Sequence, residues 1–230
     1  MYTQNKIIYN VTENLLSDCK ENSIDIRLFG SVALLYLDKT KIDIISKYHG
    51  IIGDIDIIIK HEHLTKLEDY CIKQGYTTNR KIKMLYGNKR RSFYLDNNIS
   101  IDVFIGDITL CQKIPILNRF NLSYPTITPV DLFLTKIQKL YLSDSDVYDI
   151  TFILEHIINF QYIIDLSSKN WNWWKVLTKN IDFILKKDIN ENNNKCLKEL
   201  LYKLNLCDKT INWKIRNIIG ERKQWYNDVE

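Results

Sequence analysis

Residues 53–59 read Gly53-Asp54-Ile55-Asp56-Ile57-Ile58-Ile59, an apolar, β-branched run that carries two aspartates one residue apart. Residues i and i+2 of a β-strand point to the same face, so the run predicts a strand on which Asp54 and Asp56 project side by side. Neighbouring carboxylates repel each other unless a cation lies between them, and a hard ion such as Mg²⁺ prefers these oxygen ligands. The alternative, a surface strand with two solvated acids, is less favoured because the isoleucines indicate a buried strand.

Two further segments point to the same site. Upstream, Ile26-Arg27-Leu28-Phe29-Gly30-Ser31-Val32-Ala33-Leu34-Leu35 predicts a strand, a Gly-Ser turn and a helix with Ser31 as N-cap, where backbone N–H groups favour phosphate. Downstream, Ile99-Ser100-Ile101-Asp102-Val103-Phe104-Ile105-Gly106 predicts a strand with one acid in its middle. Each motif alone is weak, but the ordered set of Gly-Ser, Asp-x-Asp and a later strand Asp is fairly specific.

With these residues the chain resembles the nucleotidyltransferases of the DNA polymerase β superfamily, whose pattern is Gly-Ser, then Asp-x-Asp, then a third Asp on a later strand. Within that superfamily it is most similar to the AbiEii-type toxin branch, in which a Gly closely follows the third Asp, as Gly106 follows Asp102. The branch also has a helical Asp, a Lys five residues later and a paired-Asp stretch, which residues 131–136 and 146–150 match. The resemblance spans about residues 24–150; the chain differs from the branch in lacking Gly-Gly in the first motif and Arg-x-Thr before Asp54.

The resemblance implies Mg²⁺-dependent transfer of a nucleoside monophosphate from a nucleoside triphosphate to an acceptor hydroxyl, with two metal ions. Asp54 and Asp56 would bind both ions, and Asp102 would ligate the catalytic ion and accept the hydroxyl proton. The implied nucleotide-binding residues are Gly30, Ser31, Lys136 and Asp149. For Lys136 the alternative is a solvated lysine, and for Asp149 it is an ordinary helix acid.

Length and composition are compatible with this reading. The chain has 230 residues, enough for one large domain or two small ones, and its 45% hydrophobic and 26% charged residues are ordinary for a globular protein. The net charge of +4 is compatible with a nucleotide or RNA partner. Five cysteines without a Cys-x-x-Cys motif, and no visible signal peptide or membrane-length apolar run, lead us to expect a reduced, cytoplasmic protein.

The hydrophobic periodicity, together with the resemblance, predicts an α+β protein. A polymerase β-like domain at residues 1–125, with helices on a mixed sheet, would precede a helical domain at residues 126–230. The expected strands are residues 24–29, 54–60, 76–85, 92–95 and 99–105, with a hairpin turn at residues 96–98. The expected helices are residues 5–20, 31–37, 62–75, 130–142, 146–163, 171–187, 195–206 and 209–226. We expect a loop or small helix at residues 38–53 and a polar linker at residues 190–194.

Three other clusters have a functional and a plainer interpretation. Lys89, Arg90 and Arg91 are expected in a hairpin turn, where they could contact an RNA backbone, although a solvated turn is commoner. The segment His61-Glu62-His63 is read as a surface helix start rather than a metal site. The tryptophans of residues 171–174 could stack on bases, but a place in the helix core is favoured.

Three functions follow as hypotheses. The first is a nucleotidyltransferase with RNA, tRNA in particular, as the favoured acceptor and a protein or small molecule as alternatives. Under this first hypothesis the protein could be the toxin of a toxin–antitoxin or phage-defence system, and its partner would then be an antitoxin protein. The second is a nucleotide second-messenger synthase of the same fold. The third is a non-catalytic nucleotide- or RNA-binding module, which mutation of Asp102 would separate from an enzyme.

Overall fold

The computed structural model describes residues 2–49, 52–78, 84, 87–95, 99–157 and 159–227, with side chains from residue 5 onward. The chain forms two compact units. The first comprises Met1–Ile108 and Pro115–Thr128, and the second comprises Thr109–Ile114 and Pro129–Glu230. A mixed sheet lies in the first unit and helices dominate the second, so the expected α+β class is confirmed.

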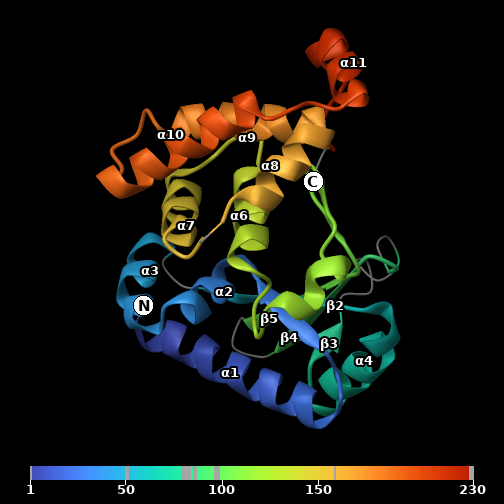
Figure 1. Cartoon of the computed structure of the whole chain (residues 1–230). Helices are drawn as coiled ribbons and strands as arrows, with labels where there is room; N and C mark the ends of the chain where they lie inside the picture. The colour runs from blue at the N-terminus through green and yellow to red at the C-terminus, as the bar shows by residue number, and fades with distance from the viewer. Residues whose placement is uncertain are drawn as a thin grey trace. The chain divides into compact units, whose positions relative to one another are not determined.

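The first unit contains a five-stranded mixed sheet in the order β1-β2-β5-β4-β3 (Figure 1). Its strands are β1 (Ile26–Phe29), β2 (Asp54–Ile59), β3 (Thr77–Thr78), β4 (Arg90–Leu95) and β5 (Ile99–Ile105). Strands β2 and β5 pair in parallel, whereas β1–β2, β4–β5 and β3–β4 are antiparallel. A separate two-stranded sheet consists of β6 (Ile108–Thr109) and β7 (Lys113–Ile114).

Buried β-branched residues explain why β2 and β5 are central. Ile55 and residues 57–59 are fully buried, as are Ile101 and Val103. Parallel strands are usually covered on both faces, and such strands read as continuous apolar runs. The expected strands at residues 54–60 and 99–105 are therefore confirmed.

In the described part of the first unit, the sheet is accompanied by the helices α1 (Tyr2–Glu21), α2 (Gly30–Leu37), α3 (Ile42–His49) and α4 (Leu64–Lys73). Short 3-10 helices are η1 (Lys39–Lys41), η2 (His61–His63) and η3 (Leu117–Leu122). Helix α2 packs against β1 and β2, and its residues 32–35 are completely buried. The region of residues 38–53, for which the sequence left a loop or a small helix open, contains the helices η1 and α3.

Of the strand expected at residues 76–85, the structure describes a short part, β3, in which Thr77 and Thr78 pair with β4. Residues 79–83 and 85–86 lie outside the described residues, as does the turn expected at residues 96–98.

The second unit is built from the helices α6 (Pro129–Ile137), α7 (Asp144–Leu154), α8 (Gln161–Lys169), α9 (Trp171–Ile184), α10 (Glu191–Leu206) and α11 (Ile211–Ile219), followed by η4 (Gly220–Arg222). Trp171 and Trp173 are buried, and Trp173 is among the largest fully buried side chains. Trp174 lies edge-on against Trp213 of α11. This placement agrees with a role of the tryptophans in packing.

Capping residues account for the helix boundaries that the sequence predicted wrongly. The single helix expected at residues 146–163 is two helices, and α7 begins earlier because Ser143 and Asp146 form a capping box. The linker expected at residues 190–194 belongs to α10, because the Asn190 side chain accepts a hydrogen bond from the Asn193 N–H as an N-cap. Helix α11 ends at Gly220, whose φ is +58°.

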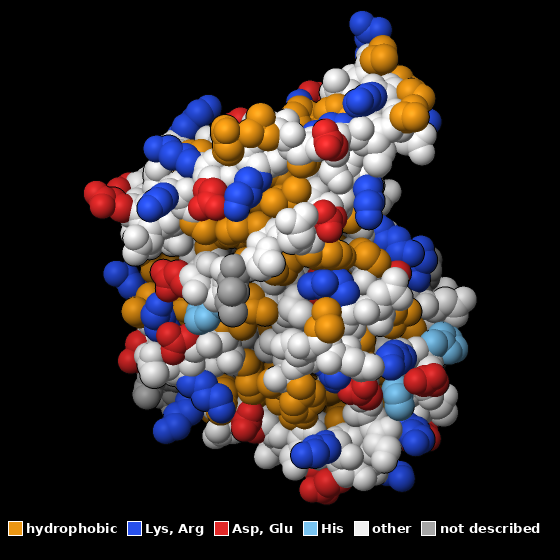
Figure 2. Space-filling view, viewed as in Figure 1, with side chains coloured by type: hydrophobic (Ala, Val, Ile, Leu, Met, Phe, Trp, Pro, Cys, Tyr) orange, Lys and Arg blue, Asp and Glu red, His pale blue; other side chains and the backbone are white. Residues whose placement is uncertain are grey.

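Helix α11 exposes Ile211, Ile215 and Ile218, which recur at helical spacing. Figure 2 shows hydrophobic side chains at the surface where Figure 1 draws α11. Across the described residues, no helix combines the length and apolar character needed to cross a membrane. All five cysteines are free.

Candidate active site

The register of β2 and β5 places the three predicted carboxylates on one face of the sheet. Asp56 is the partner of Asp102, and Asp54 is the partner of Ser100. Register partners on parallel strands project to the same side, and Asp54 and Asp56 are two residues apart. Asp54 is exposed, and Asp56 and Asp102 are half-buried. The face therefore carries three acids, two at the start of β2 and one in the middle of β5.

Both carboxylate oxygens of Asp102 accept hydrogen bonds from the neighbouring strand β4. Ser92, its register partner, donates its hydroxyl to Oδ1, and Arg90 donates from Nη2 to Oδ2 at 2.6 Å. The Arg90 guanidinium also lies over the Phe104 ring, 5.1 Å from its centre. The chain itself thus supplies a counter-charge to Asp102.

Asp54 has a different partner. Its Oδ1 accepts a hydrogen bond from the hydroxyl of the buried Ser100 on β5. The side chains of Asp54 and Asp102 are therefore turned to separate hydroxyls, although they share a face with Asp56. In the part of the chain that the structure describes, no three His, Cys, Asp or Glu side chains gather closely enough to hold a metal ion.

The donor chemistry of this face nevertheless fits a hard divalent cation. Carboxylate oxygens are the ligands that Mg²⁺ prefers, and it needs only one or two from protein. The hydroxyl and guanidinium contacts of Asp54 and Asp102 are hydrogen bonds that a cation could replace. Asp54, Asp56 and Asp102 are the residues that would hold such an ion.

Gly30 brings the turn between β1 and α2 directly against Asp56. Its φ is +69°, a left-handed conformation that favours glycine, and a Cβ atom at this position would lie 2.8 Å from Asp56 Cγ and closer still to Oδ2. Phe29, the register partner of Asp56, is the N-cap of α2. The expectation that Ser31 is the N-cap is wrong, because the chain turns one residue earlier, at Gly30. Gly30 and Ser31 form the first turn of α2, where the helix dipole favours anions.

The expectation that Lys89, Arg90 and Arg91 all lie in one hairpin turn is wrong. Lys89 is in a turn and exposed, but Arg90 and Arg91 belong to β4. Successive strand residues point to opposite faces, so the two arginines cannot form one surface with Lys89. Arg91 is mostly buried and donates from Nε to Glu68 Oε1 of α4 at 2.6 Å.

In the second unit, Lys136 of α6 and Asp149 of α7 form a buried ion pair. The Lys136 Nζ lies 2.7 Å from Asp149 Oδ2, and both residues are buried, Asp149 completely. The alternative of a solvated lysine is therefore excluded. A second ion pair joins Lys139, which follows α6, to Asp146 of α7, with Nζ 2.5 Å from Oδ1. Burial acts to raise the pKa of Asp146, but hydrogen bonds from Lys139 and Ser143 outweigh it and lower the pKa below its usual value.

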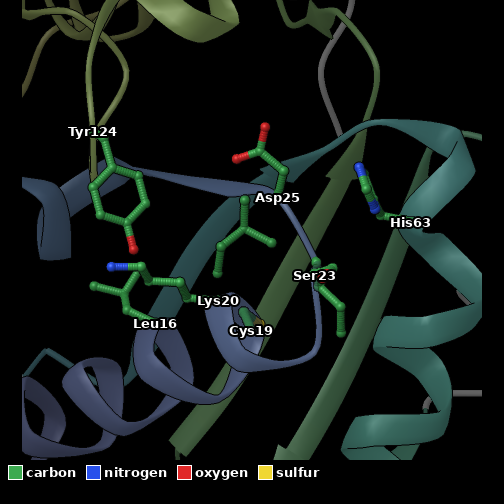
Figure 3. Close-up of a pocket in the computed structure, with 9 residues that line it drawn as sticks. Leu16, Cys19, Lys20, Ser23, Asp25, His63 and Tyr124 are labelled. Carbon is green, nitrogen blue, oxygen red and sulfur yellow. The ribbon is translucent and has the colours of Figure 1, made fainter.

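A pocket of about 540 Å³ lies elsewhere in the first unit, between the end of α1, the start of β1, His63 and Tyr124 (Figure 3). Ile26 pairs with Ile59, whereas Phe29 pairs with Asp56, so the pocket is next to the end of β1 that is remote from the carboxylates. Burial and the nearby Asp18 raise the pKa of the Cys19 thiol, which lines it, to about 12. This pocket and the carboxylate face are separate features.

Sequence reasoning did not find Ser92, Ser100 or the pairing of Arg90 with Asp102. The only available signal was alternation, because Arg90 and Ser92 are two residues apart and share a face once β4 is recognised as a strand. Which of their neighbours they touch depends on register, which the sequence does not state.

No family model and no curated protein matches the chain. The chain is similar to a solved structure, that of an antigenic nucleotidyltransferase-like protein from Paracoccidioides brasiliensis, with a TM-score of 0.44 and 14% identity. The similarity covers 90% of this chain and 95% of that one. The contacts around Asp56 and Asp102, rather than this similarity, define what the site can do.

We expect Gly30→Ala to lower the free energy of unfolding more than Gly75→Ala does. Gly75 also has a positive φ, +83°, but nothing lies within 4 Å of a Cβ placed there. Both variants should lose about 1–2 kcal/mol through the left-handed backbone, and Gly30→Ala should lose a further 1–3 kcal/mol, roughly, through the clash with Asp56. Urea unfolding measures both. In the double variant Gly30→Ala, Asp56→Ala part of the loss should return; equal losses in the two single variants would contradict the close packing.

Asp149→Asn should destabilise the helical unit strongly. It removes the counter-charge that Asp149 gives the buried Lys136 ammonium, which typically costs about 3–5 kcal/mol. The matched control is Asp144→Asn, because Asp144 is exposed and pairs with Lys187 at 3.0 Å; an exposed pair contributes little. Thermal and urea unfolding of both variants give the comparison, and similar small losses would show that the Lys136–Asp149 pair is not held as the structure has it.

Proposed function

We propose that this protein is a divalent-cation-dependent nucleotidyltransferase that moves a nucleoside monophosphate from a nucleoside triphosphate to an acceptor hydroxyl. The observation that supports this most is the pairing of Asp56 with Asp102 on parallel strands, with Asp54 on the same face. The close approach of Gly30 to Asp56 adds the start of a helix to this face. Together these supply carboxylates for a cation and backbone N–H groups for phosphate.

Each residue has a role in this reaction. The acceptor hydroxyl oxygen bonds to the α-phosphorus, the bond from that phosphorus to the pyrophosphate oxygen breaks, and Asp102 takes the hydroxyl proton. Asp54, Asp56 and Asp102 would hold Mg²⁺, which when bound neutralises charge on the phosphates. Gly30 and Ser31 orient the β,γ-phosphates.

We assign Lys136 and Asp149 to nucleotide binding, as the resemblance implies, with Asp149 keeping the Lys136 ammonium in place. The observation behind this role is the 2.7 Å ion pair within the helical unit. Lysine acts here as a point charge rather than through a planar fork.

RNA, and tRNA in particular, is the acceptor that we favour over a protein or a small molecule. The supporting observations are the net charge of +4 and the exposed Lys89. A role as a toxin with an antitoxin partner, or in phage defence, follows only from the resemblance to the AbiEii-type branch. If the acceptor is itself a nucleotide, the protein is a second-messenger synthase.

The second candidate is a nucleotide- or RNA-binding module without turnover. It is favoured by one observation: both carboxylate oxygens of Asp102 already accept hydrogen bonds within the chain, Oδ1 from Ser92 and Oδ2 from Arg90. A binder needs no free carboxylate, whereas the proposed reaction needs Asp102 to release at least one of these contacts.

Asp56→Asn should reduce transfer by about 100-fold or more, because each carboxylate lost from a cation site removes several kcal/mol of charge stabilisation. The measurement is incubation of the purified protein with each labelled nucleoside triphosphate and total cellular RNA, followed by gel and thin-layer analysis. Asp69→Asn, at an exposed position of α4, is the control for a lost acid. Turnover in Asp56→Asn equal to that of the wild type would exclude the mechanism. Nucleotide binding without transfer by the wild type would favour the binding module.

If RNA is the acceptor, its affinity should fall steeply with salt, because lysines and arginines that contact phosphates release counterions. Lys89→Ala should weaken RNA binding and leave nucleotide binding nearly unchanged, whereas Lys66→Ala on the exposed surface of α4 serves as the control. Filter binding over a range of salt concentrations measures both. An affinity that is flat with salt would shift the proposal to a protein or small-molecule acceptor.

A further inference from the structure

Asp102 is held by two contacts of different kinds. The Ser92 hydroxyl donates to Oδ1 and is neutral, whereas Arg90 Nη2 donates to Oδ2 and brings a positive charge. A cation that is ligated by Asp102 needs one of these oxygens. Because Arg90 is the charged partner, it is the contact that a second positive charge would repel.

The position of Arg90 permits it to leave Asp102 without unfolding the strand. Its side chain is 39% exposed, and its guanidinium lies over Phe104, which in turn packs edge-on against Phe29. The Arg90 Nε is buried and has no hydrogen-bond partner among the described residues. Arg90 therefore engages Asp102 with one nitrogen and not with its full bidentate fork, so this contact is less firmly held than a forked pair.

We propose that Arg90 is a positioning residue that competes with a divalent cation for Asp102. While Arg90 occupies Oδ2, the three acids of this face are partly neutralised and Asp102 is directed toward β4. When a cation binds, Arg90 gives up Oδ2 and Ser92 keeps Oδ1, so the carboxylate stays oriented. The inference rests on the proposed function, because it concerns the same carboxylates.

A purely structural Arg90 makes a different prediction. If it only stabilises β4, its replacement would lower the melting temperature and leave cation affinity unchanged or weaker. A competitor, in contrast, raises cation affinity when it is removed. The direction of the change in cation affinity therefore separates the two roles without any measurement of turnover.

The test is a titration of the full chain with Mn²⁺ alone, in which isothermal calorimetry and electron paramagnetic resonance measure the Mn²⁺ affinity. Arg90→Gln should bind Mn²⁺ about fivefold more tightly than the wild type, the equivalent of one partly exposed ion pair. Arg90→Met, which keeps an unbranched stem over Phe104, should show the same tightening. Arg90→Lys, which keeps the charge, should stay close to the wild type.

Arg91→Gln is the matched control, because Arg91 is the next residue of β4, faces the other way and pairs with Glu68. It should leave Mn²⁺ affinity unchanged. Asp56→Asn tests the site itself and should abolish Mn²⁺ binding. If the wild type binds Mn²⁺ through Asp56 but Arg90→Gln and Arg90→Met bind it no more tightly, the competition is overturned and the proposed function stands. If neither the wild type nor the Arg90 variants bind Mn²⁺, the proposed cation site and the competition both fail.

Discussion

The parallel pairing of β2 with β5 is the constraint on which the rest of the candidate site depends. It sets Asp56 beside Asp102 and Asp54 beside Ser100, and it continues into a region where the isoleucines of both strands are buried. Burial alternates at the start of β2, where Asp54 is exposed, Ile55 buried and Asp56 half-buried, and residues 57–59 are then all fully buried. A shift of one residue in this pairing would turn the acids into the core and the isoleucines outward, so the hydrophobic core and the position of the acids specify each other.

Neighbouring acids on one face repel each other, and the sheet limits this repulsion mainly with neutral donors. The register that aligns the acids also aligns a serine with two of them, Ser100 with Asp54 and Ser92 with Asp102. A hydroxyl fixes the orientation of a carboxylate without cancelling its charge. Arg90 brings a positive charge to Asp102, whereas the hydroxyls of Ser100 and Ser92 leave the charges of Asp54 and Asp102 in place. Carboxylate charge that is left in place attracts cations.

The sequence predicted the central strands well because their signal is local: β-branched residues in short runs, with acids at alternate positions. The helix starts at Ser143 and Asn190 were missed although both are good N-caps, because a polar residue between two helical runs reads equally as a linker. The cluster of Lys89, Arg90 and Arg91 was misplaced for a related reason. Three consecutive cations resemble a solvated turn, and only the pairing of β4 with β5 reveals that Arg90 and Arg91 lie on opposite faces. Register and ion-pair partners depend on tertiary contacts, which one sequence does not display.

The buried pair of Lys136 and Asp149 carries a free-energy cost of desolvation. Moving two charges out of water is expensive, and well-packed apolar residues in the same place are often as stable or more so. Helices α6 and α7 contact each other, and both carry fully buried apolar side chains, among them Leu132, Phe133, Ile150 and Ile153. Packing of these two helices therefore does not require an ion pair. What the pair does provide is an ammonium whose position is set by Asp149 rather than by solvent.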